Sequence, residues 1–213
     1  MSFNSFSAFL TGAGDSGVLL LLSLISAALI WLWHSGRAAW LLLRSVLLAV
    51  VVVTVLKVLF LSCAAHWQPD LVSPSGHACL SAAVFGSLGV VAAAGRGALA
   101  RLVIALLVAL AVAIIASSRV LIGVHTWTEV IVGLLVGVLA LVLFAWSYTR
   151  SAPPRIELVT FGVTLLATMM LTFGIRLPGE SIIRHVARNI GENCELASVE
   201  RAIRLQVHLP VRE

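Results

Sequence analysis

Charged side chains are scarce in this chain of 213 residues. Asp, Glu, Lys and Arg make up 11% of it, against 61% hydrophobic residues and a mean hydropathy of +1.10. A soluble domain carries about 25% charged residues, because polar groups must cover a surface that faces water. The shortage of charge therefore excludes a soluble globular protein and an intrinsically disordered chain. The composition predicts an integral membrane protein.

Cysteine is also rare, and the 3 residues are too scattered for a disulfide framework or a CxxC metal site. Basic residues exceed acidic ones by a net charge of +5, but all of them except Lys57 are arginines that stand singly near the ends of apolar runs or in the C-terminal region. No basic stripe with interleaved aromatic residues is present to follow a phosphate backbone. We therefore expect no nucleic-acid partner and interpret the positive charge as a topology signal.

Long apolar runs are what the chain has in place of charge. A helix needs about 20 apolar residues to cross the hydrocarbon core of a bilayer, and about 17 at the least. Six runs reach this length, joined by short connections that carry charges, glycines or prolines. The predicted spans are residues 17–33, 38–62, 76–94, 98–117, 126–148 and 156–173. We predict an all-α, six-helix membrane bundle over residues 1–175.

A tail at residues 176–213 follows the predicted bundle. Apolar residues recur in it at helical spacing from Ile182 to Ile190, opposite Arg184 and Arg188. This amphipathic pattern suits a helix that lies at the membrane interface, and equally a helix that packs on the end of the bundle. The sequence leaves both arrangements open.

The arginines predict the orientation of the bundle. The loops after the first, third and fifth spans, with their flanks, hold six arginines, whereas the loops after the second and fourth spans contribute only Arg119. Short cytoplasmic loops collect Lys and Arg. We therefore expect the loops after the second and fourth spans to face outward, into the periplasm of a Gram-negative bacterium. The expected location is the bacterial inner membrane.

Polar residues in or beside the spans gather at this outer end. A charged Lys or Arg at mid-span costs about 2.5–3.5 kcal/mol on insertion scales, so such residues need a reason to be there. The alternation of the spans brings the ends that carry them to one side, which predicts a functional site. Its members are Lys57, Ser75, His77, Arg119, His125 and Glu129.

Two short segments give this cluster its chemistry. Residues 74–77 read Pro-Ser-Gly-His and lead into an apolar helix, whose serine N-cap and free N–H groups suit an anion. Gly76 lets an oxyanion approach the backbone closely. His125 and Glu129 are four residues apart, so on a helix the carboxylate can hold the imidazole in one tautomer. Arg119 adds a fork of donors suited to phosphate oxygens.

These segments resemble motifs of the type 2 phosphatidic acid phosphatase family, membrane lipid phosphatases that share an active site with vanadium haloperoxidases. The family pattern reads Lys-x6-Arg-Pro, then Pro-Ser-Gly-His, then Ser-Arg-x5-His-x3-Asp. Residues 74–77 match the second motif, and Ser118-Arg119 with His125 match the third. The resemblance covers about residues 57–148, and six spans fit the family's core.

The sequence departs from the family pattern in two places. Lys57 is present, but Ala64-Ala65 stand where the first motif has Arg-Pro, with His66 nearby. Glu129 stands where the third motif has the shorter Asp. The first departure predicts weaker phosphate binding, and the second predicts an adjusted position of the imidazole.

The resemblance implies a role for each residue of the cluster. His125 would be the nucleophile that forms a phosphohistidine, Glu129 would fix its tautomer, and His77 would protonate the leaving group. The residues expected to bind the phosphoryl oxygens are Lys57, Ser75, Gly76 and Arg119. No metal or other cofactor is expected, since these cations and the helix start would replace magnesium.

A site at the outer face predicts a lipid phosphate as substrate, surrounded by membrane lipids. The candidates are undecaprenyl pyrophosphate, phosphatidylglycerophosphate, phosphatidic acid and a lipid A phosphate, and family analogy favours the first. Two alternatives stay open: a lipid phosphotransferase that uses the same histidine, and a non-enzymatic membrane protein with a decayed site. The sequence does not indicate an oligomeric state.

The predicted orientation can be tested by labelling. In a background without the native cysteines, Val72→Cys should react with a membrane-impermeant maleimide in intact cells, because residue 72 lies in the loop after the second span. Arg96→Cys should stay unlabelled until the cells are permeabilised. Labelling at residue 96 but not at residue 72 would reverse the topology and move substrate access to the cytoplasm.

Overall fold

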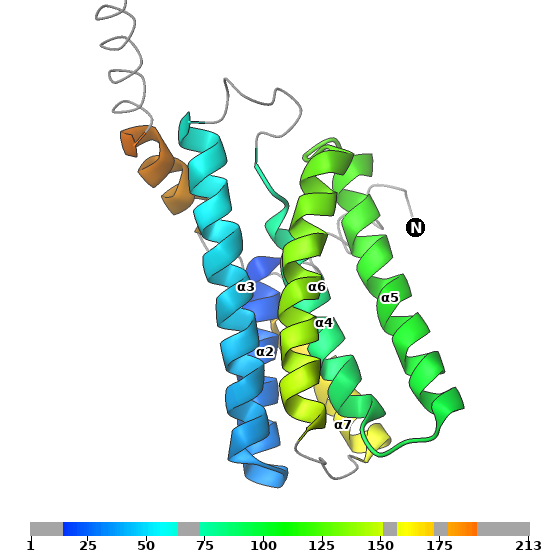
Figure 1. The fold of residues 1–213 in the computed structure, drawn as a ribbon. Helices are drawn as coiled ribbons and strands as arrows, with labels where there is room; N and C mark the ends of the chain where they lie inside the picture. The colour runs from blue at the N-terminus through cyan, green and yellow to red at the C-terminus, as the bar shows by residue number, and fades with distance from the viewer. Residues whose placement is uncertain (1–14, 64–72, 151–156, 173–178, 191–213) are drawn as a thin grey trace, which may run out of the picture.

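The computed structural model describes residues 15–63, 73–150, 157–172 and 179–190, and the regular secondary structure within these ranges is entirely helical (Figure 1). This confirms the all-α class. The helices in chain order are α2 (Ser16–Trp33), α3 (Gly36–Cys63), α4 (Gly76–Ala93), α5 (Ala98–Leu121), α6 (Trp127–Thr149), α7 (Leu158–Thr172) and a last helix over residues 179–190.

Five of the described helices, α2 to α6, are long and apolar enough to cross a membrane. The helix α7 is apolar but has 15 residues, fewer than the roughly 17 that a span requires. The sixth predicted span, at residues 156–173, therefore stays a prediction, since residues 151–156 and 173–178 lie outside the described ranges. A multi-pass membrane protein is what the described helices support.

The predicted boundaries agree with the helix ends to within two residues, except at the end of α5. The apolar run was predicted to end at residue 117, but α5 continues to Leu121. The serine and arginine at residues 118 and 119 interrupt the apolar pattern without breaking the helix, and the hydroxyl of Ser118 donates to the backbone oxygen of Ile115 at 2.7 Å. Arg119 thus belongs to the last turn of α5.

The helix α4 forms the centre of the bundle and contacts α2, α3, α5 and α6. Small residues line much of its length and are buried, including Ala78, Ser81, Ala83 and Gly86. Small side chains let helix backbones approach closely in a membrane protein. By contrast, α5 lies at the edge of the bundle (Figure 1) and exposes large apolar side chains along most of its length.

One stripe of α6 holds this helix against α4. A Cβ added at Gly133 would collide with the backbone oxygen of Ser75, and one added at Gly137 would collide with that of Cys79. Only glycine fits at these two positions while the helices stay this close. The same stripe carries Glu129 one turn before Gly133, so the close packing of α6 on α4 also sets the distance between Glu129 and the start of α4.

The last helix, residues 179–190, lies beside the end of α3 (Figure 1). Ala187 is buried, whereas Ile182 and Val186 remain exposed. The sequence-based division into a bundle at 1–175 and an amphipathic tail at 176–213 stays a prediction, because residues 173–178 and 191–213 lie outside the described ranges.

The packing of α6 on α4 predicts the effect of adding one methyl group. Gly133→Ala should lower stability by about 1–3 kcal/mol, the usual cost of overpacking, because the new Cβ meets backbone atoms that cannot rotate away. Gly162→Ala in α7 is the matched control, since nothing lies within 4 Å of its added Cβ. Thermal unfolding in detergent measures both, and equal melting temperatures for the two variants would contradict the close contact.

Candidate active site

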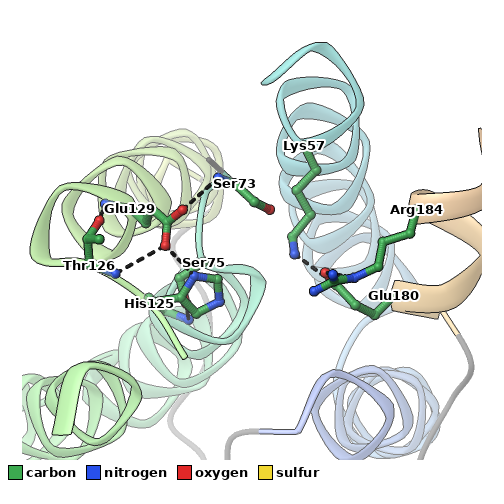
Figure 2. Close-up of polar contacts among 9 residues, drawn as sticks. Lys57, Ser73, Ser75, His125, Thr126, Glu129, Glu180 and Arg184 are labelled. Atoms are coloured by element: carbon green, nitrogen blue, oxygen red, sulfur yellow. Dashed lines mark hydrogen bonds and ion pairs between the residues drawn. The ribbon is translucent and has the colours of Figure 1, made fainter. Parts of the chain in front are cut away.

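The polar residues predicted from the sequence lie at one end of the described bundle, where α4 and α6 begin and α5 ends (Figure 1). Figure 2 shows two groups of contacts there, one around Glu129 and one around Glu180. The first joins the start of α6 to the segment that precedes α4. The second joins α3 to the helix at residues 179–190.

The carboxylate of Glu129 is the centre of the first group. Its Oε1 accepts a hydrogen bond from the backbone N–H of Ser73 at 2.7 Å, and its Oε2 accepts one from the backbone N–H of Thr126 at 3.1 Å. The Oε2 atom also lies 2.8 Å from Nδ1 of His125. The Glu129 side chain is buried. A single carboxylate thus connects the α4 approach, the start of α6 and the histidine.

Glutamate has a structural advantage over aspartate at this position. Thr126 is the N-cap of α6 and its hydroxyl accepts a hydrogen bond from the backbone N–H of Glu129 at 3.3 Å, while the Glu129 side chain returns to the backbone N–H of Thr126. This is a capping box, a motif that uses Glu or Gln at the third helical position. The glutamate at this position of the third motif therefore both caps α6 and accepts the hydrogen bond from His125.

The start of α4 is fixed against α6 by backbone contacts. The N–H of Ser75 donates to the backbone oxygen of Glu129 at 2.9 Å. The Ser75 side chain is fully buried, and its hydroxyl accepts from the N–H of Ala78 at 3.4 Å as the N-cap of α4. Gly76 lies beside Lys57, since a Cβ added to it would be 3.5 Å from the Lys57 Cε.

A sharp turn between α5 and α6 brings His125 back toward Arg119. Gly123 adopts a φ of 72°, a left-handed conformation that favours glycine. After this turn the backbone N–H of His125 donates to the backbone oxygen of Arg119 at 3.2 Å. A carboxylate can only accept, so Nδ1 of His125 must donate to Glu129, which leaves Nε2 with the lone pair.

The electrostatics of His125 favour this neutral form. Burial lowers the pKa of His125 below its ordinary value of 6.5, the hydrogen bond and negative charge of Glu129 raise it, and the positive charges of Lys57 and Arg119 lower it further. The net direction is downward. The imidazole is therefore uncharged at neutral pH and available as a nucleophile.

Arg119 and Lys57 are both buried cations of the described site. Arg119 is 8% exposed, and among the described residues its Nε and Nη1 atoms have no hydrogen-bond partner. A buried donor that makes no hydrogen bond costs on the order of 1–3 kcal/mol, and more when it is charged. Two such donors on one guanidinium could bind an anion.

His77 faces a carboxylate that the sequence did not assign to the site. Its Nε2 lies 3.9 Å from Oδ2 of Asp15, whose Oδ1 caps α2 by accepting from the N–H of Gly17 at 2.8 Å. His77 is also within electrostatic range of Lys57, Arg119 and His125. An Asp before an apolar run signals a helix N-cap, but no sequence pattern pairs it with a histidine in α4.

The structure therefore brings the predicted site residues together at one end of the bundle. It adds Ser73, Thr126, Asp15 and Glu180 as neighbours of those residues. The Thr-x-x-Glu spacing of a capping box was a readable signal for Thr126. Ala64, Ala65 and His66 lie outside the described residues, and within the described ranges no group of three or more His, Cys, Asp or Glu side chains is placed to hold a metal.

Comparison with known proteins agrees with the motifs. A family model described as the PAP2 superfamily matches residues 38–153, which include α4, α5, α6 and most of α3. No curated protein and no solved structure matches the chain. The matched segment contains the His125–Glu129 pair, Ser75 and Arg119.

The pairing with Glu129 predicts how the titration of His125 responds to mutation. Glu129→Gln keeps an oxygen that can accept from Nδ1 but removes the negative charge, so the pKa of His125 should fall further below 6.5. Histidine NMR in detergent, with His125→Gln to assign the signal, measures this shift. Glu157→Gln, at a fully exposed carboxylate before α7, should leave the pKa unchanged. A higher pKa in Glu129→Gln would show that the two side chains do not interact as observed.

Proposed function

The chain belongs to the PAP2 superfamily, and from this membership and the geometry of the site we propose that it hydrolyses a lipid phosphate through a phosphohistidine on His125. Members of this family are phosphatases that act on phosphate esters. The observation that carries the proposal is the buried guanidinium of Arg119, whose Nε and Nη1 have no partner in the described structure. It lies within electrostatic range of His125, whose Nδ1 faces Glu129 so that Nε2 keeps its lone pair.

The first step is attack on phosphorus. The Nε2 lone pair of His125 forms a bond to the phosphorus atom while the bond from phosphorus to the leaving oxygen breaks. Glu129 stabilises the imidazolium that develops, because its carboxylate accepts from Nδ1–H. In this proposal, Arg119 and the N-terminus of α4 beside Ser75 bind the equatorial oxygens of the phosphoryl group.

His77 has the role of proton donor and acceptor. It gives a proton to the leaving oxygen in the first step and takes one from the attacking water in the second, when the N–P bond breaks. The Oδ2 atom of Asp15 lies 3.9 Å from the Nε2 atom of this imidazole. The products are inorganic phosphate and a lipid alcohol, or a lipid monophosphate when the substrate is a diphosphate.

A membrane lipid is the substrate that fits the surroundings of the site. The cluster lies at the end of the apolar bundle, and Trp127, the first residue of α6, is exposed there at a position typical of interfacial aromatic residues. The arginine distribution supports an outward-facing site in a bacterial inner membrane. Undecaprenyl pyrophosphate is our first candidate, because such a site would meet it in the outer leaflet.

The activity can be tested with the purified protein in detergent. It should release inorganic phosphate from at least one of undecaprenyl pyrophosphate, phosphatidylglycerophosphate and phosphatidic acid, should remain active in EDTA, and should be inhibited by vanadate as a transition-state analogue. His125→Ala should reduce kcat at least about 1,000-fold, on the order of 4 kcal/mol of barrier. His34→Ala, at the C-cap of α2, is the matched control and should keep full activity.

Each departure from these results has a distinct meaning. Phosphate release that survives His125→Ala, or that requires magnesium, would contradict the mechanism. Transfer of labelled phosphate to an added acceptor lipid in place of water would identify a phosphotransferase. No release from any of the lipids would favour a non-enzymatic protein.

A further inference from the structure

The second group of contacts at the site connects Lys57 to the helix at residues 179–190. The Nζ atom of Lys57 lies 2.7 Å from Oε2 of Glu180, 123 positions away in the chain. Lys57 is buried, with 5% of its surface exposed, whereas the side chain of Glu180 is half-exposed at 49%. The partner of this buried lysine is thus a carboxylate in contact with water.

The same carboxylate contacts a second cation. Its Oε1 lies 3.5 Å from Nε of Arg184, so that one oxygen of Glu180 faces the lysine and the other faces the arginine (Figure 2). Ion pairs between residues four apart on a helix are common and contribute little. The additional contact with a buried lysine from α3 is what makes this pair unusual, because a single anion bridges cations from two separate helices.

The charge of Glu180 also reaches the catalytic cluster. Burial raises the pKa of Glu180, but the hydrogen bond and charge of Lys57 and the charges of Arg184 and His125 outweigh it, so that the pKa lies below its ordinary value. Glu180 is therefore an anion at neutral pH. Arg119 lies within range of its charge as well.

The position of this anion coincides with a requirement of the proposed chemistry. Lys57 is the first-motif lysine expected to bind a phosphoryl oxygen, and that motif lacks its arginine, with Ala64 in its place. In the structure Arg184, from the helix at residues 179–190, contacts the same Glu180 carboxylate as Lys57. Arg184 carries a guanidinium, which is the group that Ala64 does not provide in the first motif.

We propose that Arg184 is a phosphate-binding residue of the active site. The Glu180 carboxylate lies between Arg184 and Lys57, and a phosphate oxygen of the substrate displaces it and takes its position. This inference rests on the proposed function for its substrate. It assigns to the helix at residues 179–190 both a binding group and the anion that competes with the substrate.

The proposal and a purely structural role for the same contacts predict different changes in anion affinity when these residues are mutated. If Glu180 competes with phosphate, Glu180→Gln should bind phosphate and vanadate more tightly, because a neutral amide is a weaker partner for two cations. If Glu180 only positions Lys57, its removal should weaken anion binding. If Arg184 only pairs with Glu180 at the surface, Arg184→Gln should have no effect on anion binding.

The experiment uses the full chain in detergent and measures KM, kcat and the inhibition constants of inorganic phosphate and vanadate. Arg184→Gln should raise KM and both inhibition constants about tenfold, a loss typical of one hydrogen bond to a charged group, with kcat changed much less. Arg184→Lys should recover part of the loss. Glu180→Gln should lower both inhibition constants at least about threefold, within the range of one such hydrogen bond.

Arg188→Gln is the matched control, one turn further along the same helix, and should match the wild type. Unchanged constants in Arg184→Gln, or weaker anion binding in Glu180→Gln, would overturn the proposal. Should the wild type release no phosphate from any lipid, calorimetric titration of the same variants with vanadate tests the anion site by itself. Tighter vanadate binding in Glu180→Gln and weaker binding in Arg184→Gln would support the anion site although the proposed activity had failed. Equal vanadate affinities in all variants would reject the anion site.

Discussion

The carboxylate of Glu129 is the constraint on which the rest of the site depends. It is buried, and it accepts hydrogen bonds from two backbone N–H groups and from the imidazole of His125. These donors come from the approach to α4, from the first turn of α6 and from the turn after α5. The glycines of α6 set the distance that makes this possible, because a larger residue at Gly133 would move Glu129 away from Ser75. The packing of α6 on α4 and the orientation of His125 therefore depend on the same carboxylate.

A second histidine follows the same plan in a looser form. The Oδ2 atom of Asp15 faces His77, and its Oδ1 atom caps α2. Glu129 likewise faces His125 and caps α6 with the same carboxylate. In both cases the acidic group stands at a helix N-terminus, where the helix dipole favours negative charge. A carboxylate already held by backbone donors has few conformations left, so it can orient a neighbouring imidazole at little further cost in entropy.

The sequence predicted most of what lies along α4, α5 and α6, since motif spacing and the alternation of spans bring those helix ends together. It did not predict Ser73, which contributes a backbone N–H that almost any residue has. Nor did it predict the contact between Lys57 and Glu180, because periodicity shows which face of a helix is apolar but not which helix end it will meet. The extension of α5 was missed for a related reason: Arg119 ends the apolar pattern, while the backbone hydrogen bonds of the last turn do not depend on polarity.

The burial of Arg119 has a consequence for how the protein divides work between folding and binding. Within the part of the chain that the structure describes, the Nε and Nη1 atoms of Arg119 have no partner, and burying such donors costs free energy that folding must supply. In the proposed mechanism, a phosphate would meet a donor that is already buried and oriented, so it would not have to strip water from that cation itself. This is electrostatic preorganisation, which lowers the reorganisation needed at the moment of reaction. If the proposed function is right, a bound phosphate should therefore also stabilise the folded protein, because ligand binding to the folded state alone raises its stability.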